Sequence, residues 1–181
     1  MGEIRQATAA DAAALHEVAA ATFALACPPG TSEADVAEFI TLHLSEQRFA
    51  DYLADPARQL FVWDAGERLE GAVLINGYTM LVHGEPHDPD VAGAVSLRPT
   101  AELSKIYVRP DAHGSGIATQ LMQATVGAAR DAGAASVWLG VNQQNARANR
   151  FYEKSGFALV GTKRFLVGAE WHDDFVREFV L

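Results

Sequence analysis

The sequence contains little of what several large classes of proteins require. It has one cysteine, Cys27, among 181 residues, which excludes an internal disulfide and is typical of a reducing compartment. We expect no apolar run to reach the roughly 18 residues of a membrane span, and the N-terminal MGEIRQATAAD lacks the basic, apolar and small-residue regions of a signal peptide. The chain is therefore predicted to be cytoplasmic, with no membrane partner.

Positive charge is also scarce, since 14 Lys and Arg oppose 23 Asp and Glu for a net charge of −9. Nucleic acid is therefore an unfavourable partner, because phosphate backbones demand basic patches. Residues 1–100 hold 15 acidic and 5 basic side chains (5 − 15 = −10), whereas residues 101–181 hold 8 and 9 (9 − 8 = +1). This asymmetry predicts that the two halves of the chain face different ligands. The alternative explanation is that the acidic residues lie on ordinary solvated helix faces.

The length and the 49% hydrophobic content predict one domain, residues 1–181, with a sizeable core. Helices are predicted at 9–23 and 32–55, each preceded by a capping signal. Strands are predicted within 59–80, joined by a turn at residues 65–66. The turn-rich segment 82–98 is predicted to be a mobile loop.

Strands and helices alternate from residue 100 onward, which predicts an α/β fold with mixed strand pairing. The two helices in this half are predicted to end at Gly133 and Gly156, and the chain closes with a pair of strands. Metal binding is not expected, because the His and Asp residues of the segment 83–90 lie among glycines and prolines, as in a solvated loop.

Two glycines, Gly114 and Gly116, lie between a predicted buried strand at 103–108 and the first of these helices. The first amides of a helix have no backbone partner, and the helix dipole favours an anion at that end. Small residues there let a phosphate approach the backbone. The alternative is a tight strand-to-helix turn with no ligand.

Two well-known phosphate loops do not match this segment. A P-loop needs Lys and then Ser or Thr after its last glycine, where this chain has Ile117 and Ala118. A dinucleotide fingerprint needs Gly or Ala where Thr119 stands, and an acidic residue at the end of the next strand, which runs VWLGVN. A different kind of anion loop is therefore indicated.

The segment from Val108 to Ala118, V-x-P-x-x-H-G-S-G-I-A, resembles the acyl-CoA pyrophosphate loop of the GCN5-related N-acetyltransferases (GNAT), usually written Gln/Arg-x-x-Gly-x-Gly/Ala. His113 stands where Gln or Arg is usual, while Gly116 and Ala118 match. The second family signature follows as Asn145-x-x-Ala148-x-x-Phe151-Tyr152-Glu153-Lys154-x-Gly156-Phe157. The resemblance covers residues 3–181 and is specific over about 100–168.

This resemblance implies a single GNAT-type domain, with a mixed, mostly antiparallel central sheet of six to seven strands and about four flanking helices. It implies acetyl-CoA (coenzyme A) as cosubstrate. The residues that it assigns to cofactor binding are Ile106, Tyr107, Val108, His113, Gly114, Ser115, Gly116, Ile117, Ala118, Asn145, Ala148 and Arg150. For Arg150 the alternative is the solvated side of an ordinary helix.

Two catalytic residues are implied, Tyr152 and Glu102. Asn145, Ala148 and Tyr152 follow one another at i, i+3 and i+7, which predicts a shared helix face. In the family this face carries pantetheine toward the sulfur, so Tyr152 is placed to protonate the departing thiolate, the alternative being a core aromatic residue. Glu102 would draw off the proton of the amine, and otherwise it is an exposed strand residue.

The implied reaction moves acetyl from acetyl-CoA to a primary amine. The C-terminal strands also resemble the PaiA-type bacterial polyamine N-acetyltransferases, through Gly156, Phe157, Val160, Gly161, Phe165, Gly168 and Asp173. A polyamine or diamine acceptor is therefore a hypothesis, drawn to carboxylates such as Glu33, Asp35 and Glu38, although Lys163 departs from the pattern. The alternatives are a peptide or lysine amine, or a non-catalytic acyl-CoA-binding module, and both a monomer and a homodimer are compatible with the sequence.

Overall fold

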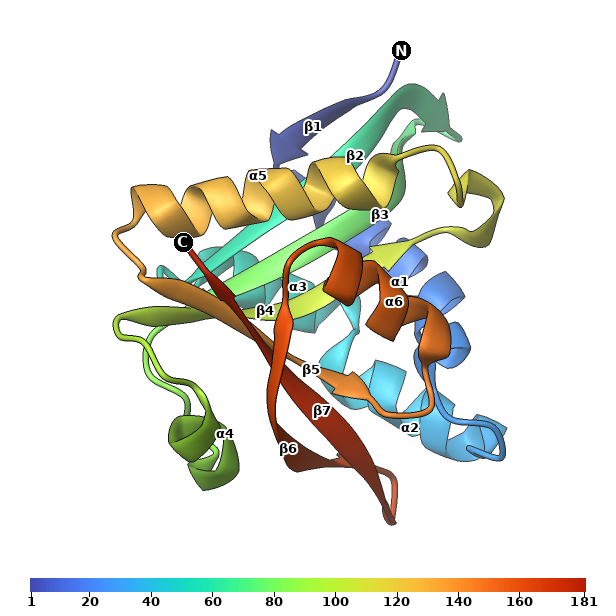
Figure 1. The fold of residues 1–181 in the computed structure, drawn as a ribbon. Helices are drawn as coiled ribbons and strands as arrows, with labels where there is room; N and C mark the ends of the chain where they lie inside the picture. The colour runs from blue at the N-terminus through green and yellow to red at the C-terminus, as the bar shows by residue number, and fades with distance from the viewer.

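One mixed sheet organises the molecule, and the computed structural model describes all 181 residues of it. Its strands are β1 (Glu3–Gln6), β2 (Arg58–Leu69), β3 (Ala72–His83), β4 (Thr100–Val108), β5 (Ser136–Asn142), β6 (Ala158–Val167) and β7 (Glu170–Val180). They lie in the order β1-β2-β3-β4-β5-β7-β6, as Figure 1 shows. Only β4 and β5 pair in parallel, which confirms the predicted mixed, mostly antiparallel sheet.

Helices cover both faces of this sheet. They are α1 (Ala12–Ala26), α2 (Glu33–His43), α3 (Glu46–Ala54), α4 (Pro89–Ala94), α5 (Ile117–Asp131) and α6 (Ala146–Lys154), with short 3-10 turns η1 (Ala9–Asp11) and η2 (Pro110–Ala112). Successive strand side chains point to opposite faces. Accordingly Met80 belongs to the buried cluster with α1, whereas Leu81 belongs to the cluster with α5 and α6.

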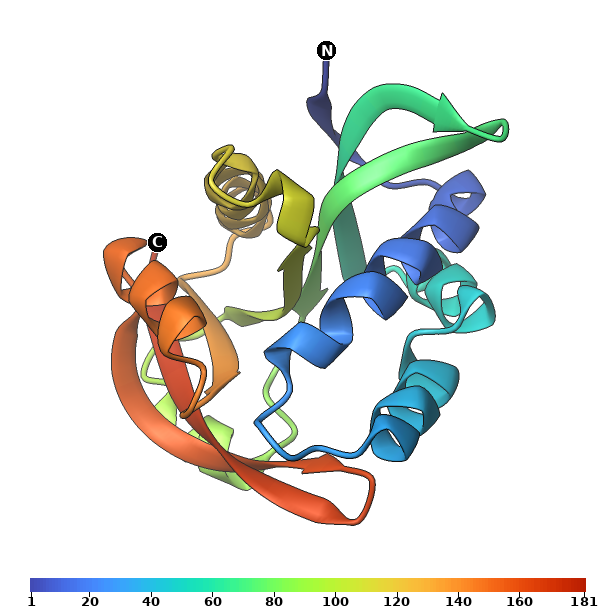
Figure 2. The same cartoon turned by 90° about the vertical axis from the view of Figure 1, so that its right-hand side faces the viewer.

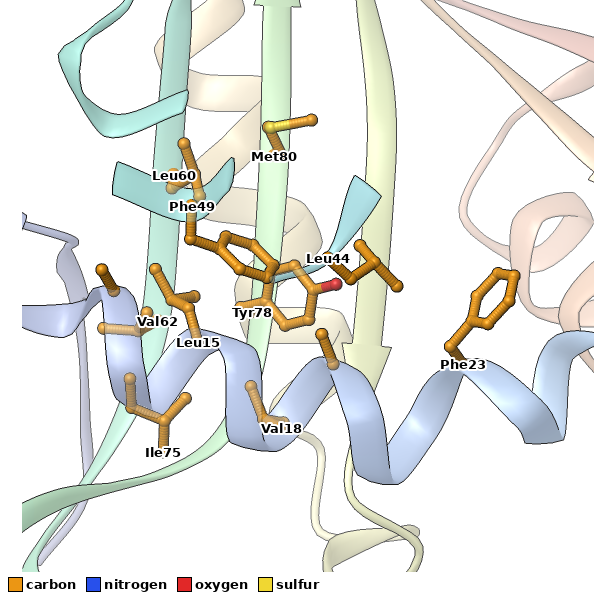
Figure 3. Packing of buried hydrophobic residues seen from close by; sticks show 12 residues of the cluster. Leu15, Val18, Phe23, Leu44, Phe49, Leu60, Val62, Ile75, Tyr78 and Met80 are labelled. Atoms are coloured by element: carbon orange, nitrogen blue, oxygen red, sulfur yellow. The ribbon is translucent and has the colours of Figure 1, made fainter. Parts of the chain in front are cut away.

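The α1 face holds the larger buried cluster, which Figure 3 shows at close range. Leu15 and Val18 of α1 pack over the sheet, and Phe49 of α3 meets Tyr78 of β3 edge to face with ring centroids 5.6 Å apart. Aromatic edge contacts of this kind add to the hydrophobic gain from burial. An apolar core therefore holds α1 and α3 against this face of the sheet.

The segment Ala9–Ala26 satisfies the length and composition of a membrane-crossing helix, with a mean hydropathy of 1.2 over 18 residues. The expectation that no stretch reaches this length was therefore wrong. In this structure the apolar side chains Leu15, Val18 and Phe23 of that segment lie in the core. These side chains of α1 thus form part of the core on that face of the sheet.

Several local predictions differ from the structure. The helical region predicted at 32–55 is two helices, because the hydroxyl of Ser45 accepts a hydrogen bond from the amide of Arg48 and starts α3 anew. The hairpin turns at residues 70–71, where both φ angles are positive, and Gly66 lies in an irregularity of β2 instead. The turn thus forms at Gly71 and not at Gly66, although both glycines have a positive φ angle.

The segment 82–98 is more ordered than the predicted mobile loop. It contains the short helix α4, which packs against β6. Its end is anchored to β7, because the carboxylate of Glu178 accepts hydrogen bonds from the backbone of Ser96 and Leu97 and from the Ser96 hydroxyl. A contact with a residue 81 to 82 positions further along the chain could not be read from local patterns.

The parallel strands β4 and β5 separate soon after they meet. Their pairing is confined to Thr100–Glu102 with Ser136–Trp138, after which β5 continues along β7 as far as Asn142. Figure 2 shows β5, β7 and β6 diverging from the first four strands. The edge of β4 beyond Glu102 consequently has no strand partner on that side, and a ligand can use its backbone groups.

Candidate active site

A cleft of about 400 Å³ opens where β4 and β5 separate. Its walls come from β4, from the start of α5, from α6 and from the C-terminal strands. Phe23 of α1 and Cys27, which directly follows that helix, also line it. The cleft has the size and the largely apolar lining of a small-molecule site. Burial raises the pKa of the Cys27 thiol, so this residue lines the cleft as an unreactive thiol.

The N-terminal end of α5 forms one end of the site. Gly114 and Gly116 adopt φ angles of 82° and 84°, and Gly116 is the N-cap residue without any side-chain cap. None of the backbone amides from Gly114 to Thr119 donates a hydrogen bond within the chain. A run of unpaired amides at the positive end of a helix is suited to a pyrophosphate.

His113 has a different contact from the one that the sequence suggested. Its Nε2 donates to the carbonyl of Val108 over 2.8 Å, and its Nδ1 accepts from Nη1 of Arg147 over 2.7 Å. Both ring nitrogens are therefore engaged. The residue joins the end of β4 to the start of α6, so the unpaired donors that this loop offers a ligand are its backbone amides.

The helix α6 presents the predicted face to the cleft, since Asn145, Ala148 and Tyr152 all line it. The side-chain oxygen of Asn145 accepts from the amide of Ala148 and caps the helix, which leaves its amide nitrogen free to donate. Burial raises the pKa of the Tyr152 hydroxyl well above its usual value. This phenol therefore keeps its proton and can act as a proton donor.

A buried arginine holds α6 in position. Nε of Arg177, on β7, donates to the side-chain oxygen of Asn149, while its Nη2 donates to Glu153. The amide of Asn149 in turn donates to the carbonyls of Asn142 and Asn145. This network ties the helix that carries Tyr152 to two strands.

Glu102 is the last residue of β4 that pairs with β5, and it lines the cleft that begins there. Burial raises the pKa of its carboxyl group, with an opposing effect of Lys105. A bulge at Ser104, between the pairs Leu81–Leu103 and Met80–Lys105, shifts the alternation by one residue. Glu102 and Lys105 therefore reach the same cleft, and burial lowers the pKa of Lys105 to about 8.

A second pair of charges comes from the last two strands. Nζ of Lys163 lies 3.8 Å from Oδ2 of Asp174, and the two side chains are 14% and 8% exposed. Burial raises the pKa of Asp174 to about 6, and Lys163 opposes that rise. The stem of Lys163 crosses the face of Gly140 so closely that a methyl group there would collide with it. Glycine on β5 thus gives this lysine its path into the cleft.

Most of the predicted site residues line this cleft: Glu102, Ile106, Tyr107, Val108, His113, Ala118, Asn145, Ala148 and Tyr152. Gly114, Ser115 and Gly116 are exposed beside it. Ile117 is the first residue of α5 and its side chain is buried, so only its backbone can contact a ligand. Arg150 is exposed and does not line the cleft, whereas Arg147 does.

The sequence did not assign Lys105 or Asp174 to the site. Lys105 precedes the apolar run Ile106–Val108 of its strand, and that position was the available signal. Asp174 follows His172 and Asp173 in a polar stretch of β7, so no local pattern distinguished it. The carboxylates proposed to attract a polyamine, Glu33, Asp35 and Glu38, lie on α2 and do not line the cleft. No group of three or more His, Cys, Asp or Glu side chains is placed to hold a metal ion.

Comparison with known proteins gives concordant matches. The family model described as "Acetyltransferase (GNAT) family" matches residues 29–157. An uncharacterized N-acetyltransferase of Mycobacterium tuberculosis is 44% identical over 172 residues, which are 94% of this chain and 99% of the relative.

Solved structures agree in fold. The PaiA N-acetyltransferase of Thermoplasma acidophilum, in complex with coenzyme A, superposes with a TM-score of 0.75 at 19% identity, covering 100% of this chain and 99% of that one. A GCN5-related N-acetyltransferase of Rhodopseudomonas palustris gives a TM-score of 0.70 at 19% identity, covering 100% and 96%. At these identities the two structures establish a common fold and nothing finer.

Proposed function

The chain belongs to the acetyltransferase (GNAT) family, and from this premise we propose that it acetylates a primary amine held beside Glu102. Acetyl-CoA is the cosubstrate, and it supplies the activated acetyl group as a thioester. The residues present fit this molecule, because unpaired amides, an open strand edge and a buried phenol follow one another along a single cleft.

The observation that carries the proposal is the placement of two titratable groups at the inner part of the cleft. Glu102 and Tyr152 line it together, and burial raises the pKa of both side chains. A carboxylate with a raised pKa is a stronger base near neutral pH, whereas a phenol with a raised pKa remains a donor. The pair can therefore serve the two proton transfers that amide formation requires.

Each residue then has a stated role. The backbone of the open edge of β4, at Ile106–Val108, donates hydrogen bonds that orient the cosubstrate and polarise its carbonyl group. The carboxylate of Glu102 takes the proton of the amine, directly or through water. The hydroxyl of Tyr152 gives its proton to the sulfur that leaves. The free amides from Gly114 to Thr119 bind the pyrophosphate.

A panel of primary amines with acetyl-CoA tests the proposal, with release of free thiol as the measurement. We expect release that depends on the amine and that falls by at least about a hundredfold in Glu102→Gln. Coenzyme A binding by calorimetry without amine-dependent release from any acceptor would instead support the non-catalytic binding module. Glu70→Gln, in the exposed turn of the first hairpin, serves as the control.

The polyamine acceptor remains a hypothesis within this proposal. Its support is the acidic N-terminal half of the chain, and the observation against it is that Lys105 and Lys163 line the cleft. At about 5 Å and an effective dielectric constant of about 20, two like charges repel by about 3 kcal/mol. Spermidine should therefore be compared with butylamine at low and high salt. A higher kcat/KM for spermidine that shrinks with salt would favour the polyamine.

A peptide amine is the other finer alternative. A peptide acceptor would extend from the cleft over α1 and α2, whose residues Phe23 and Phe39 line its outer wall. The amine panel should therefore include a tripeptide with a free N-terminus, the same tripeptide with that terminus blocked, and a blocked lysine. Acetylation of only the free terminus would identify an α-amine acceptor.

A further inference from the structure

We propose that the acceptor carries a carbonyl or carboxylate oxygen next to its amino group, and that the ammonium group of Lys163 binds this oxygen. The inference rests on the proposed function and adds the chemical class of the acceptor. It arises from a buried cation that the mechanism above does not use, placed where two cavities meet.

Lys163 has no hydrogen-bond partner in the chain, although it lines the cleft. Its side chain is only 14% exposed, and its nearest carboxylate oxygen, on Asp174, is 3.8 Å from Nζ, which is an ion-pair distance too long for a hydrogen bond. The donors of this ammonium group are therefore left to whatever occupies the two cavities that it lines. An acceptor oxygen of a ligand can replace water on these donors.

The surroundings hold this side chain in place. Gly140 leaves room for its stem, and the ammonium group lies 5.2 Å from the centre of the Phe165 ring. Any side chain larger than hydrogen at 140 would collide with the lysine. In this structure the ammonium group therefore lies between Gly140 of β5 and the Phe165 ring of β6.

A second cavity of about 230 Å³ adjoins the cleft. The segment 82–88 and Trp138 line it, and it shares only Glu102 and Lys163 with the main cleft. The indole Nε1 of Trp138 is a buried donor with no partner in the chain. This volume is several times that of one water molecule, so the junction can admit a small polar group of the acceptor beyond its amino nitrogen.

Glu102 and Lys163, the two residues shared by the cavities, require opposite hydrogen-bonding groups in a ligand. Glu102 is paired with Trp138 in the parallel ladder, and its carboxylate accepts hydrogen bonds from an amine. Lys163 offers only donors. A molecule that satisfies both at one junction needs an amino group and an oxygen acceptor close together. An α-amino carbonyl unit has this arrangement, and it occurs in free amino acids, amino amides and peptide N-termini alike.

Matched acceptors test this inference, each skeleton being used with and without the oxygen group. The pairs are alanine and ethylamine, leucine and isopentylamine, and phenylalanine and phenylethylamine, together with leucinamide and spermidine. We expect kcat/KM to be at least about tenfold higher for the oxygen-bearing member of a pair, because one hydrogen bond to a charged group is involved.

The substitution Lys163→Met keeps the length of the stem and removes the donors. Because Lys163 also acts on Glu102 electrostatically, the readout is the ratio of kcat/KM within one pair, in which a change in the base cancels. We expect this ratio to fall by about tenfold or more. Lys163→Arg should retain most of it, and Lys154→Met, on the exposed end of α6, should leave it unchanged.

The outcomes separate the inference from the proposed function. If Lys163→Met lowers kcat/KM for leucine but not for leucinamide, relative to isopentylamine, the group bound is a carboxylate. If it lowers kcat/KM equally for leucine and leucinamide, the group bound is the carbonyl that both share with peptides. Three results would overturn the inference and leave the acetyltransferase activity in place. They are acetylation of the oxygen-free amines equally well or alone, a kcat/KM ratio that Lys163→Met does not change, and a preference for spermidine. No thiol release with any amine overturns the proposed function itself.

Discussion

Replacing Gly116 by aspartate should separate folding from cofactor binding. The glycine is the N-cap of α5 with φ of 84°, a conformation that Asp and Asn adopt more readily than other residues with a side chain. A methyl group built there meets only the end of the Gln120 side chain at 4.0 Å. The substitution therefore costs backbone strain of about 1 to 2 kcal/mol but no collision, and the protein should fold.

The effect on cofactor binding should be much larger. The new carboxylate would lie beside the unpaired amides from Gly114 to Thr119, where the pyrophosphate is proposed to bind. Two unit charges about 4 Å apart repel by about 4 kcal/mol at an effective dielectric constant of about 20. That energy corresponds to an increase in Kd of about a thousandfold. Gly116→Asn has nearly the same shape and strain without the charge, so its Kd should rise far less.

Calorimetric titration with coenzyme A, alongside thermal unfolding, is the assay. For a chain of this length the strain predicts a fall in Tm of about 2 to 8 °C in both variants. If Gly116→Asp bound coenzyme A as tightly as Gly116→Asn does, the anion site would lie elsewhere. A Tm that fell much further in the aspartate variant alone would mean that folding, rather than charge at the site, explains the loss.

Three further predictions concern the inner part of the cleft. Tyr152→Phe should lower kcat by at least about tenfold while the Kd of acetyl-CoA stays within about threefold, and unchanged turnover would make Tyr152 a packing residue. In a plot of kcat/KM against pH, activity should rise as the carboxyl group of Glu102 loses its proton. The midpoint of this rise should lie above the ordinary pKa of glutamate, because burial raises the pKa of Glu102, and Glu102→Gln should abolish the rise. Gly140→Ala places a methyl group against Cε of Lys163; because that atom belongs to the far end of a flexible side chain, the lysine should move aside and the free energy of unfolding in urea should fall by less than about 1 kcal/mol, whereas a larger fall that Lys163→Ala recovers would show that the stem is held rigidly.

Local patterns were sufficient for the parts of the site that lie on single elements. The glycines at 114 and 116 predicted a helix N-terminus open to an anion, and the structure leaves the amides there unpaired. The spacing of Asn145, Ala148 and Tyr152 predicted one helix face, and all three line the cleft. Helical periodicity and the steric freedom of glycine act over a few residues, so both are legible in a sequence.

Contacts between distant segments had to come from the tertiary structure. Where β4 and β5 stop pairing depends on β5 following β7 instead, and β7 begins 28 residues after β5 ends. Glu102 and Lys163 meet only through that arrangement. The sequence alone thus determined the family fold, the glycine loop with unpaired amides at the start of α5, and the face of α6. The tertiary structure decided which charges surround the acceptor, because strand register and burial are set by packing among segments far apart in the chain.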